Sequence, residues 1–162
     1  MPTKELLEAA SLPHEEGLGA LKMLEVEEVC HATSGPRSQL LWQQGARPGP
    51  ARMPRLIERD RRGYLELRSV LRRCSADWIG TDALLRDARF PERQRKAARG
   101  ALKALVALEH LEWRHHSQQS FVWRWIGPRG QSNLYRTTAA IVSLDDERAA
   151  LEEQLRFDPE DQ

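Results

Sequence analysis

The sequence predicts a mainly α-helical chain with small β-hairpins, of the α+β class, built from two copies of one small unit. Three observations lead to this prediction. Segments with helical periodicity alternate with short segments of strand-like alternation. Apolar segments recur in the same order about 80 residues later, and a segment rich in proline and glycine separates the two copies. A chain of 162 residues is long enough for two such units.

The repeat is visible at three places along the chain. TKELLEAASLP at 3–13 corresponds to TDALLRDARFP at 81–91, ALKML at 20–24 to ALKAL at 101–105, and LLW at 40–42 to FVW at 121–123. The first spacing is 78 residues (81 minus 3) and the other two are 81 residues (101 minus 20). Agreement in the same order indicates a duplication. The three extra residues of the second copy precede ALKAL and add almost one helical turn.

The first copy is expected over residues 1–44 and the linker over 45–62. A helix capped by Thr3 is followed by a second helix from Pro13. Strands are expected over 26–33 and 38–43, around a turn at 34–37. Residues 45–54 contain three prolines and two glycines, which excludes regular structure there. The expected buried faces of the two helices comprise Leu6, Leu7 and Ala10, and Leu18, Leu21 and Leu24.

The second copy is expected over residues 63–130, followed by a segment at 131–162 with an acidic helix. Its first helix carries an apolar stripe, a short strand follows at 78–79, and Thr81 is the expected cap of the next helix. A third helix runs from Glu92 to about His110, and the strands 111–116 and 121–126 form a hairpin. The stripe comprises Tyr64, Leu67, Leu71 and Cys74, and the third helix buries Ala98, Ala101, Leu102, Leu105 and Leu108. Trp123 and Trp125 are expected in the core because Trp123 matches Trp42 of the first copy.

This order of helices followed by a hairpin resembles the winged-helix family of helix-turn-helix proteins, in two tandem copies. The resemblance rests on residues 81–90 as second helix, 91–109 as third helix and 111–126 as wing, with a match over 3–43 in the first copy. The first copy lacks a first helix, so it is degenerate and requires a helix from elsewhere. The expected donor is the C-terminal helix at about 144–157. The sequence is equally compatible with donation within the chain and across a dimer.

Charge is distributed unevenly along the chain, although the net charge is only +1. Residues 1–31 carry a net charge of −5, residues 47–73 one of +6, residues 78–143 one of +6, and residues 144–162 one of −6. A polyanion is therefore attracted to the middle of the chain and repelled by its ends. Solvated helix faces are the alternative explanation of each charged run.

The resemblance implies that the second copy binds double-stranded DNA with its third helix and wing. On that helix, cations at steps of three and four lie on a different face from the core. Arginine pairs with guanine or phosphate and glutamine with adenine, whereas lysine contacts phosphates. The expected contacts of the helix are Arg89, Arg93, Gln94, Arg95, Lys96, Arg99 and Lys103. Those of the wing are Arg114, His115, His116, Gln118 and Arg124, although polar turns commonly have such residues.

A second basic element follows the proline-rich segment and includes Arg55, Arg59 and Arg62. It is expected to follow the DNA backbone or, alternatively, to pair with the acidic ends of the chain. The third helix of the first copy instead carries Glu15 and Glu16, followed by Gly17 and Gly19, which weaken a helix. The first copy is therefore expected to be an interaction module, and a homodimer through it or through the C-terminal helix is a further expectation.

Catalytic and ligand-binding motifs are not found in the sequence. The five histidines and two cysteines lack metal-ligand spacing, and there is no glycine-rich phosphate loop. We therefore expect no enzyme activity, no cofactor, no metal, no small-molecule ligand and no membrane association. Two hypotheses remain. One is a cytoplasmic DNA-binding protein, nucleoid-associated if bacterial, that acts in transcription regulation or in replication and maintenance. The other is a non-catalytic tandem winged-helix adaptor that assembles a larger protein complex.

Overall fold

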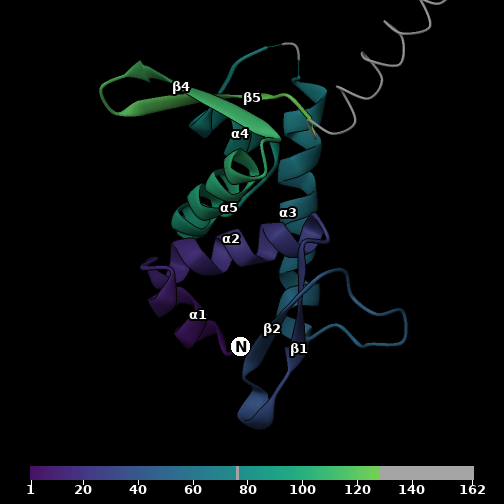
Figure 1. Ribbon diagram of the computed structural model, residues 1–162. Helices are drawn as coiled ribbons and strands as arrows, with labels where there is room; N and C mark the ends of the chain where they lie inside the picture. Colours follow the sequence, from purple (N-terminus) through teal and green to yellow (C-terminus); the bar gives the residue numbers. More distant parts are fainter. Residues whose placement is uncertain (76, 128–162) are drawn as a thin grey trace, which may run out of the picture. The chain divides into compact units, whose positions relative to one another are not determined.

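The structure is a computed structural model in which residues 1–75 and 77–127 are described, and Met1–Ile126 forms one compact unit (Figure 1). It combines helices with two small antiparallel sheets, which agrees with the α+β class. The first half contains α1 (Thr3–Ala9), α2 (His14–Val26), β1 (Cys30–Ser34), the 3-10 turn η1 (Pro36–Ser38) and β2 (Leu40–Gln44). The second half contains α3 (Arg55–Arg73), β3 (Ile79–Gly80), α4 (Thr81–Asp87), the 3-10 turn η2 (Glu92–Gln94), α5 (Arg95–Ala107), β4 (Leu111–Ser117) and β5 (Ser120–Trp125).

Within residues 1–75 and 77–127 the expected elements are present, with shifted boundaries. A strand was expected from Val26, but α2 continues to Val26 because this residue is buried in the core. The chain then reverses at Glu28, which has a φ of 60°, and β1 begins at Cys30. In the second half the expected hairpin is confirmed, as β4 pairs with β5 and β5 with β3.

The three residues that lengthen the second copy do not extend its third helix. They form η2, a separate 3-10 turn between Pro91 and α5. The helices α2 and α5 are therefore both 13 residues long. The insertion adds a turn with its own side chains, including Arg93, at a point where the first half passes from Pro13 directly into α2.

The helix α3 begins inside the segment that was expected to be a linker. Its first helical residue is Arg55, so residues 55–62 are helical and only the preceding residues connect the halves. Pro54 precedes the helix in an extended conformation, which suits proline, and no helix-breaking residue follows before Gly63. Ile57 is 2% exposed, and its burial stabilises these first turns.

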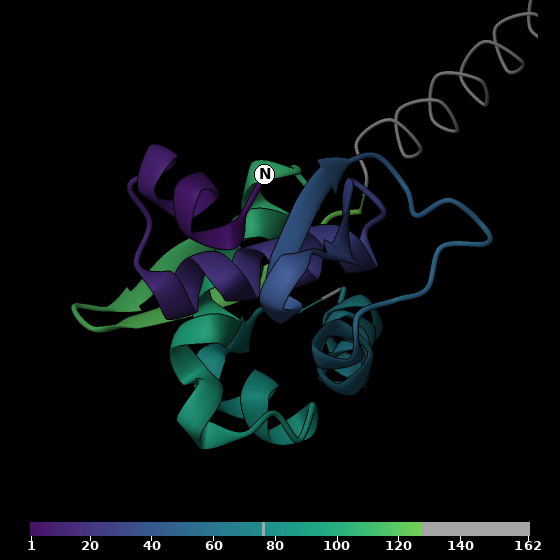
Figure 2. The ribbon, with the colours of Figure 1, turned by 90° about the horizontal axis from the view of Figure 1, so that it is seen from below.

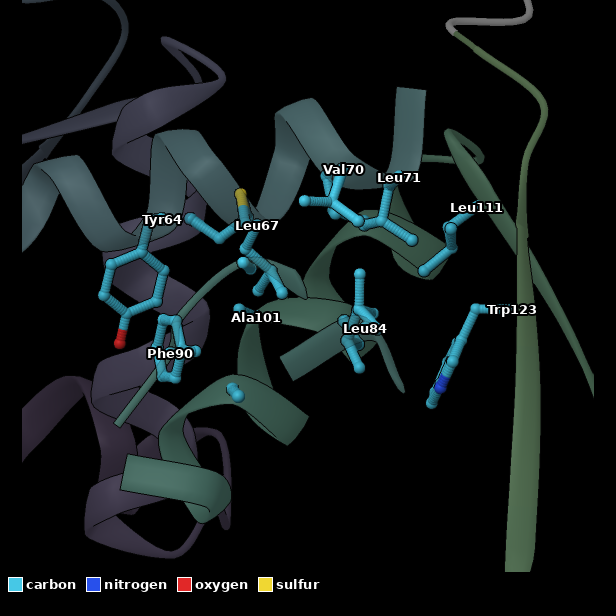
Figure 3. Packing of buried hydrophobic residues seen from close by; sticks show 14 of the residues in the cluster. Tyr64, Leu67, Val70, Leu71, Leu84, Phe90, Ala101, Leu111 and Trp123 are labelled. Carbon is cyan, nitrogen blue, oxygen red and sulfur yellow. The ribbon is translucent and has the colours of Figure 1, made fainter. Parts of the chain in front are cut away.

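One helix contributes to two hydrophobic cores. Ile57, near the start of α3, packs in the first core with Leu7, Leu21, Ala32 and Trp42. Further along α3, the residues Tyr64, Leu67, Val70 and Leu71 pack in the second core with Leu84, Ala101, Leu111 and Trp123 (Figure 3). The first turns of α3 thus contribute to the core of the first half. The donor expected at 144–157 lies outside the described residues.

The two halves repeat the same hydrogen bond in their cores. The indole Nε1 of Trp42 donates to Oγ1 of Thr3 at 2.9 Å, and that of Trp123 donates to Oγ1 of Thr81 at 2.9 Å. Both threonines were expected to cap their helices, and this expectation is wrong. Pro2 and Gly80 occupy the N-cap positions, and neither helix has a side-chain cap. Each threonine hydroxyl instead joins a helix to the buried tryptophan of its hairpin.

The halves meet through α2 and α5, which pack against each other along their backbones (Figures 1 and 2). A Cβ atom on Gly19 would lie 1.9 Å from the carbonyl oxygen of Ala97. A Cβ atom on Gly100 would lie 1.8 Å from the carbonyl oxygen of Glu16. Gly100 is the repeat equivalent of Gly19, and Ala97 that of Glu16, each at a spacing of 81 residues (100 minus 19). The contact is therefore reciprocal and requires glycine on both sides.

We predict that Gly100→Ala destabilises the protein by about 2–3 kcal/mol, because its methyl group cannot fit against the carbonyl oxygen of Glu16. The sign of the stability change tests the contact, because replacing glycine by alanine at an open helix position would instead stabilise the protein by about 1 kcal/mol. Urea denaturation measures the difference. Gly80→Ala is the control, because nothing lies within 4 Å of its Cβ position and its φ is −71°. Equal stability of the two variants would contradict the close helix contact.

Candidate nucleic-acid interface

The face of α5 that was expected to enter the major groove of DNA lies next to the face that packs against α2. Gly100 and Ala97 lie against the backbone of α2. Lys103 forms an ion pair with Glu16, and Lys96 lies 3.9 Å from Glu15. A helix that reads base edges must present this face to the groove. Lys96, Arg99 and Lys103 are nevertheless exposed, so base reading by this face of α5 stays a prediction.

The glycines of the first copy have a structural role that their helix propensity does not suggest. Gly17 and Gly19 are both buried, and the carboxylates of Glu15 and Glu16 approach the lysines of α5. This helix contacts α5 of the same chain, and the expectation that the first copy is an interaction module stays a prediction. These ion pairs are largely exposed and contribute little, typically below about 1 kcal/mol each. The backbone contact is the main constraint.

An open cleft of about 740 Å³ lies between α3 and the turn that connects α4 to α5. We call it the arginine cleft. Its charged and amide-bearing lining comprises Arg59, Arg62, Arg73, Arg89, Arg93 and Gln94, with the acids Asp60, Glu66 and Asp87. Two sets of cations that the sequence suggested separately, one after the linker and one at the start of the third helix, therefore lie in one cleft. The wall of the cleft that η2 forms consists of the three-residue insertion.

The arginines of the cleft are only partly neutralised by its acids. The carboxylate of Asp60 accepts hydrogen bonds from Lys22 at 2.5 Å and from Arg59 at 2.8 Å. Within the described residues, Arg62, Arg89 and Arg93 are exposed and have no carboxylate within 4.0 Å. Three neighbouring cations without counterions produce a positive potential that attracts an anion.

A buried ion pair lies at the edge of this cleft. Lys22 of α2 and Asp60 of α3 have side chains that are 10% and 9% exposed. Burial by itself would raise the pKa of Asp60, but hydrogen bonds from Arg59 and Lys22, together with their charges, lower it below its ordinary value. Asp60 therefore stays ionised, and its charge is matched by Lys22 from the first half.

The other helix residues that were expected to contact DNA lie outside the arginine cleft. Arg95 is held by the carboxylates of Asp82 and Glu92. Arg99 is exposed and lines a second hollow of about 420 Å³ beside the hairpin. Arg55 is exposed at the first residue of α3 and lines a different hollow, outside the arginine cleft.

The hairpin candidates do not form one surface. The guanidinium groups of Arg114 and Arg124 lie 4.3 and 4.6 Å from the ring centroid of Trp78, and Arg124 also pairs with Glu112. The side chain of Arg124 thus has partners within the protein, whereas it was expected to reach a phosphate. His115 packs on the ring of Phe121, with centroids 4.8 Å apart.

The last two candidates lie near the tip of the hairpin. His116 is exposed and lines the hollow that contains Arg99. Gln118 is exposed between the two strands.

Sequence reasoning missed Arg73 and the aromatic residues Trp78 and Trp113. Arg73 follows Arg62 by eleven residues, about three helical turns, so helical periodicity places both on one face. Trp113 is 47% exposed, and alternation along β4 places it on the same face as His115. Trp123 was expected in the core and is 6% exposed.

Both cysteines are free and half-buried. Burial raises the pKa of the Cys30 thiol to about 11, which disfavours the reactive thiolate. In the part of the chain that the structure describes, no group of three or more histidine, cysteine or acidic residues is arranged to hold a metal ion. None of the helices described there has both the length and the apolar composition needed to cross a membrane.

Comparison with known proteins gives no match: no protein-family model, no curated protein and no solved structure is similar to this chain.

We predict that Asp60→Asn lowers the free energy of unfolding at pH 7 by about 3 kcal/mol, because it leaves the buried ammonium of Lys22 without its counterion. Because the pKa of Asp60 is lowered on folding, the ionised carboxylate stabilises the folded state. This stabilisation is complete above the ordinary pKa of 3.8 and is lost as the pH falls through the lower pKa of the folded state.

The stability difference between the wild type and Asp60→Asn should therefore be constant from pH 7 to 5 and decrease below about pH 3.8. Urea denaturation across this pH range measures it. Glu66→Gln, an exposed substitution on the same helix, is the matched control and should change stability by less than about 0.5 kcal/mol. An equal effect of the two variants would show that the Lys22 pair contributes nothing specific.

Proposed function

We propose that this protein binds double-stranded nucleic acid through the arginine cleft, by contacts to phosphates rather than by a helix in the major groove. The observation that carries the proposal is the position of Arg62, Arg89 and Arg93. They come from separate segments, line one open cleft and have no carboxylate partner among the described residues. Like charges held close together repel each other, and an anion between them removes this cost.

Phosphate suits these groups. The planar guanidinium group donates two parallel hydrogen bonds to phosphate oxygens. A nucleic-acid backbone presents phosphates at regular intervals, which suits several arginines along one cleft. Gln94, which lines the same cleft, adds a neutral donor. Phosphate contacts position a protein but carry no sequence information, so binding through this cleft is sequence-independent.

We also propose that each half is a winged helix-turn-helix unit. Three features support this assignment: the order of two helices and a hairpin in each half, the repeated tryptophan–threonine hydrogen bond, and α3 as first helix of the second unit. In this assignment the two third helices, α2 and α5, pack against each other through the faces that carry Gly19 and Gly100. The cations of η2 and α3 then add a basic surface to the exposed cations of α5.

A non-catalytic adaptor that binds protein is the second candidate function. The packing of α2 against α5 favours it, because one face of each third helix already makes a protein contact. The two candidates differ in their response to salt. Binding to phosphates releases counterions and weakens steeply as salt is added.

We predict that a labelled 20-base-pair duplex of random sequence binds the wild type with a log–log salt slope of about −4 to −5, as expected for about five phosphate contacts. Arg62→Ala with Arg93→Ala should reduce the slope by about 2 and lower affinity at least about tenfold. Fluorescence anisotropy between about 50 and 200 mM salt measures both quantities.

Arg37→Ala with Arg52→Ala is the control, because it removes the same charge from two exposed arginines outside the cleft. This variant should keep most of the affinity. Equal losses in both double variants would indicate general electrostatic attraction. Absence of duplex binding at about 50 mM salt would favour the adaptor.

A further inference from the structure

One face of the hairpin β4–β5 carries exposed aromatic side chains that the fold does not require. Trp113 and His115 lie on β4, and Phe121 lies opposite His115 on β5. Trp113 is 47% and Phe121 36% exposed. Their ring centroids are 5.5 Å apart, and the ring of His115 lies 5.4 Å from that of Trp113. We call these three residues the aromatic face.

The first half of the chain shows which aromatic residue the architecture needs. Trp123 and its equivalent Trp42 are both buried and make the same hydrogen bond to a threonine. The equivalent of Trp113, at a spacing of 81 residues, is Ala32, which is fully buried. The aromatic face is thus a property of the second half alone. Exposed aromatic rings grouped together indicate contact with another molecule.

Cations flank the aromatic face on two sides. On one side Phe121 borders the hollow of about 420 Å³ that also contains Arg86, Arg99 and His116. On the other side Phe121 and Trp113 border a hollow of about 260 Å³ that also contains Lys103. The one acid in these two linings is Asp82, and its carboxylate is already paired with Arg95. Arg99 has no carboxylate within 4.0 Å among residues 1–75 and 77–127.

This combination of flat rings and flanking cations matches one kind of partner. A single-stranded nucleic acid presents unpaired bases, which stack on aromatic rings, and phosphates, which bind arginine and lysine. A duplex keeps its bases stacked inside and cannot use the rings. An apolar protein surface uses the rings but gains nothing from Arg99, which has no carboxylate partner among the described residues.

We propose that the aromatic face stacks unpaired bases of single-stranded nucleic acid, while Arg86 and Arg99 bind the adjoining phosphates. The residues differ from those of the arginine cleft, so this inference does not rest on duplex binding. With both surfaces occupied, the protein would bind a strand next to a duplex.

The test compares two probes of equal charge, a 12-nucleotide oligothymidylate and an abasic strand of the same length. Fluorescence anisotropy of labelled probes gives affinity, and quenching of tryptophan emission reports stacking. The wild type should bind the oligothymidylate at least about tenfold more tightly than the abasic strand. Trp113→Ala with Phe121→Ala should abolish this difference. Arg62→Ala with Arg93→Ala should preserve it.

Two further variants keep the result interpretable. Leu12→Ala with Val29→Ala removes two exposed apolar side chains, 40% and 38% exposed, from the first half and should retain the preference. Trp113→Leu with Phe121→Leu keeps apolar bulk at both positions and so preserves the fold. It should still lose the preference for oligothymidylate over the abasic strand, because leucine has no flat ring. Thermal unfolding followed by circular dichroism checks that each variant is folded.

Three outcomes would overturn the inference. The first is equal affinity for the two strands, and the second is full binding by both aromatic variants. The third is a protein that self-associates in sedimentation through these rings, which would make the aromatic face an interface between copies. Duplex binding without oligothymidylate binding would remove this inference and leave the arginine cleft. Oligothymidylate binding without duplex binding would support this inference and remove the proposal for the arginine cleft.

Discussion

The close contact between α2 and α5 is the constraint on which the rest of the structure depends. Gly19 and Gly100 occupy equivalent positions in the two halves, and each lies against a carbonyl oxygen of the other helix. Without side chains at these points the backbones approach closely, and dispersion contacts act along both helices. This contact joins two units that would each be very small, and it makes Met1–Ile126 one compact unit.

This contact also determines which cations remain available. Lys96 and Lys103 pair with carboxylates of α2, whereas Arg99 of α5 is exposed and has no carboxylate within 4.0 Å among the described residues. Arg93, in the three-residue insertion, lines one cleft with Arg62 of α3 and a second hollow with residues of α2. The acidic character of the first half is complementary to α5. The cationic surface extends from the helix to the turn before it.

Several local features were predictable because their causes lie close together in the sequence. The hairpin β4–β5 follows from side-chain alternation over residues 111–126. The buried position of Trp123 follows from its match with Trp42. The prediction that Thr3 and Thr81 are N-caps was wrong, although threonine is a favoured capping residue, because a buried indole across the hairpin takes each hydroxyl. The first turns of α3 were assigned to a linker because the partners of Ile57 are far away in the sequence.

The sequence by itself determined the duplication, the helical and strand-like segments and the segregation of charge, since each depends on residue type and short-range spacing. The tertiary structure decided which face of each third helix is free. Periodicity separates the core face of α5 from its other faces, but it does not show that α2 covers one of them. The structure also decided that arginines from α3 and from η2 share a cleft. Such convergence depends on how distant segments pack, and packing is a property of the folded chain.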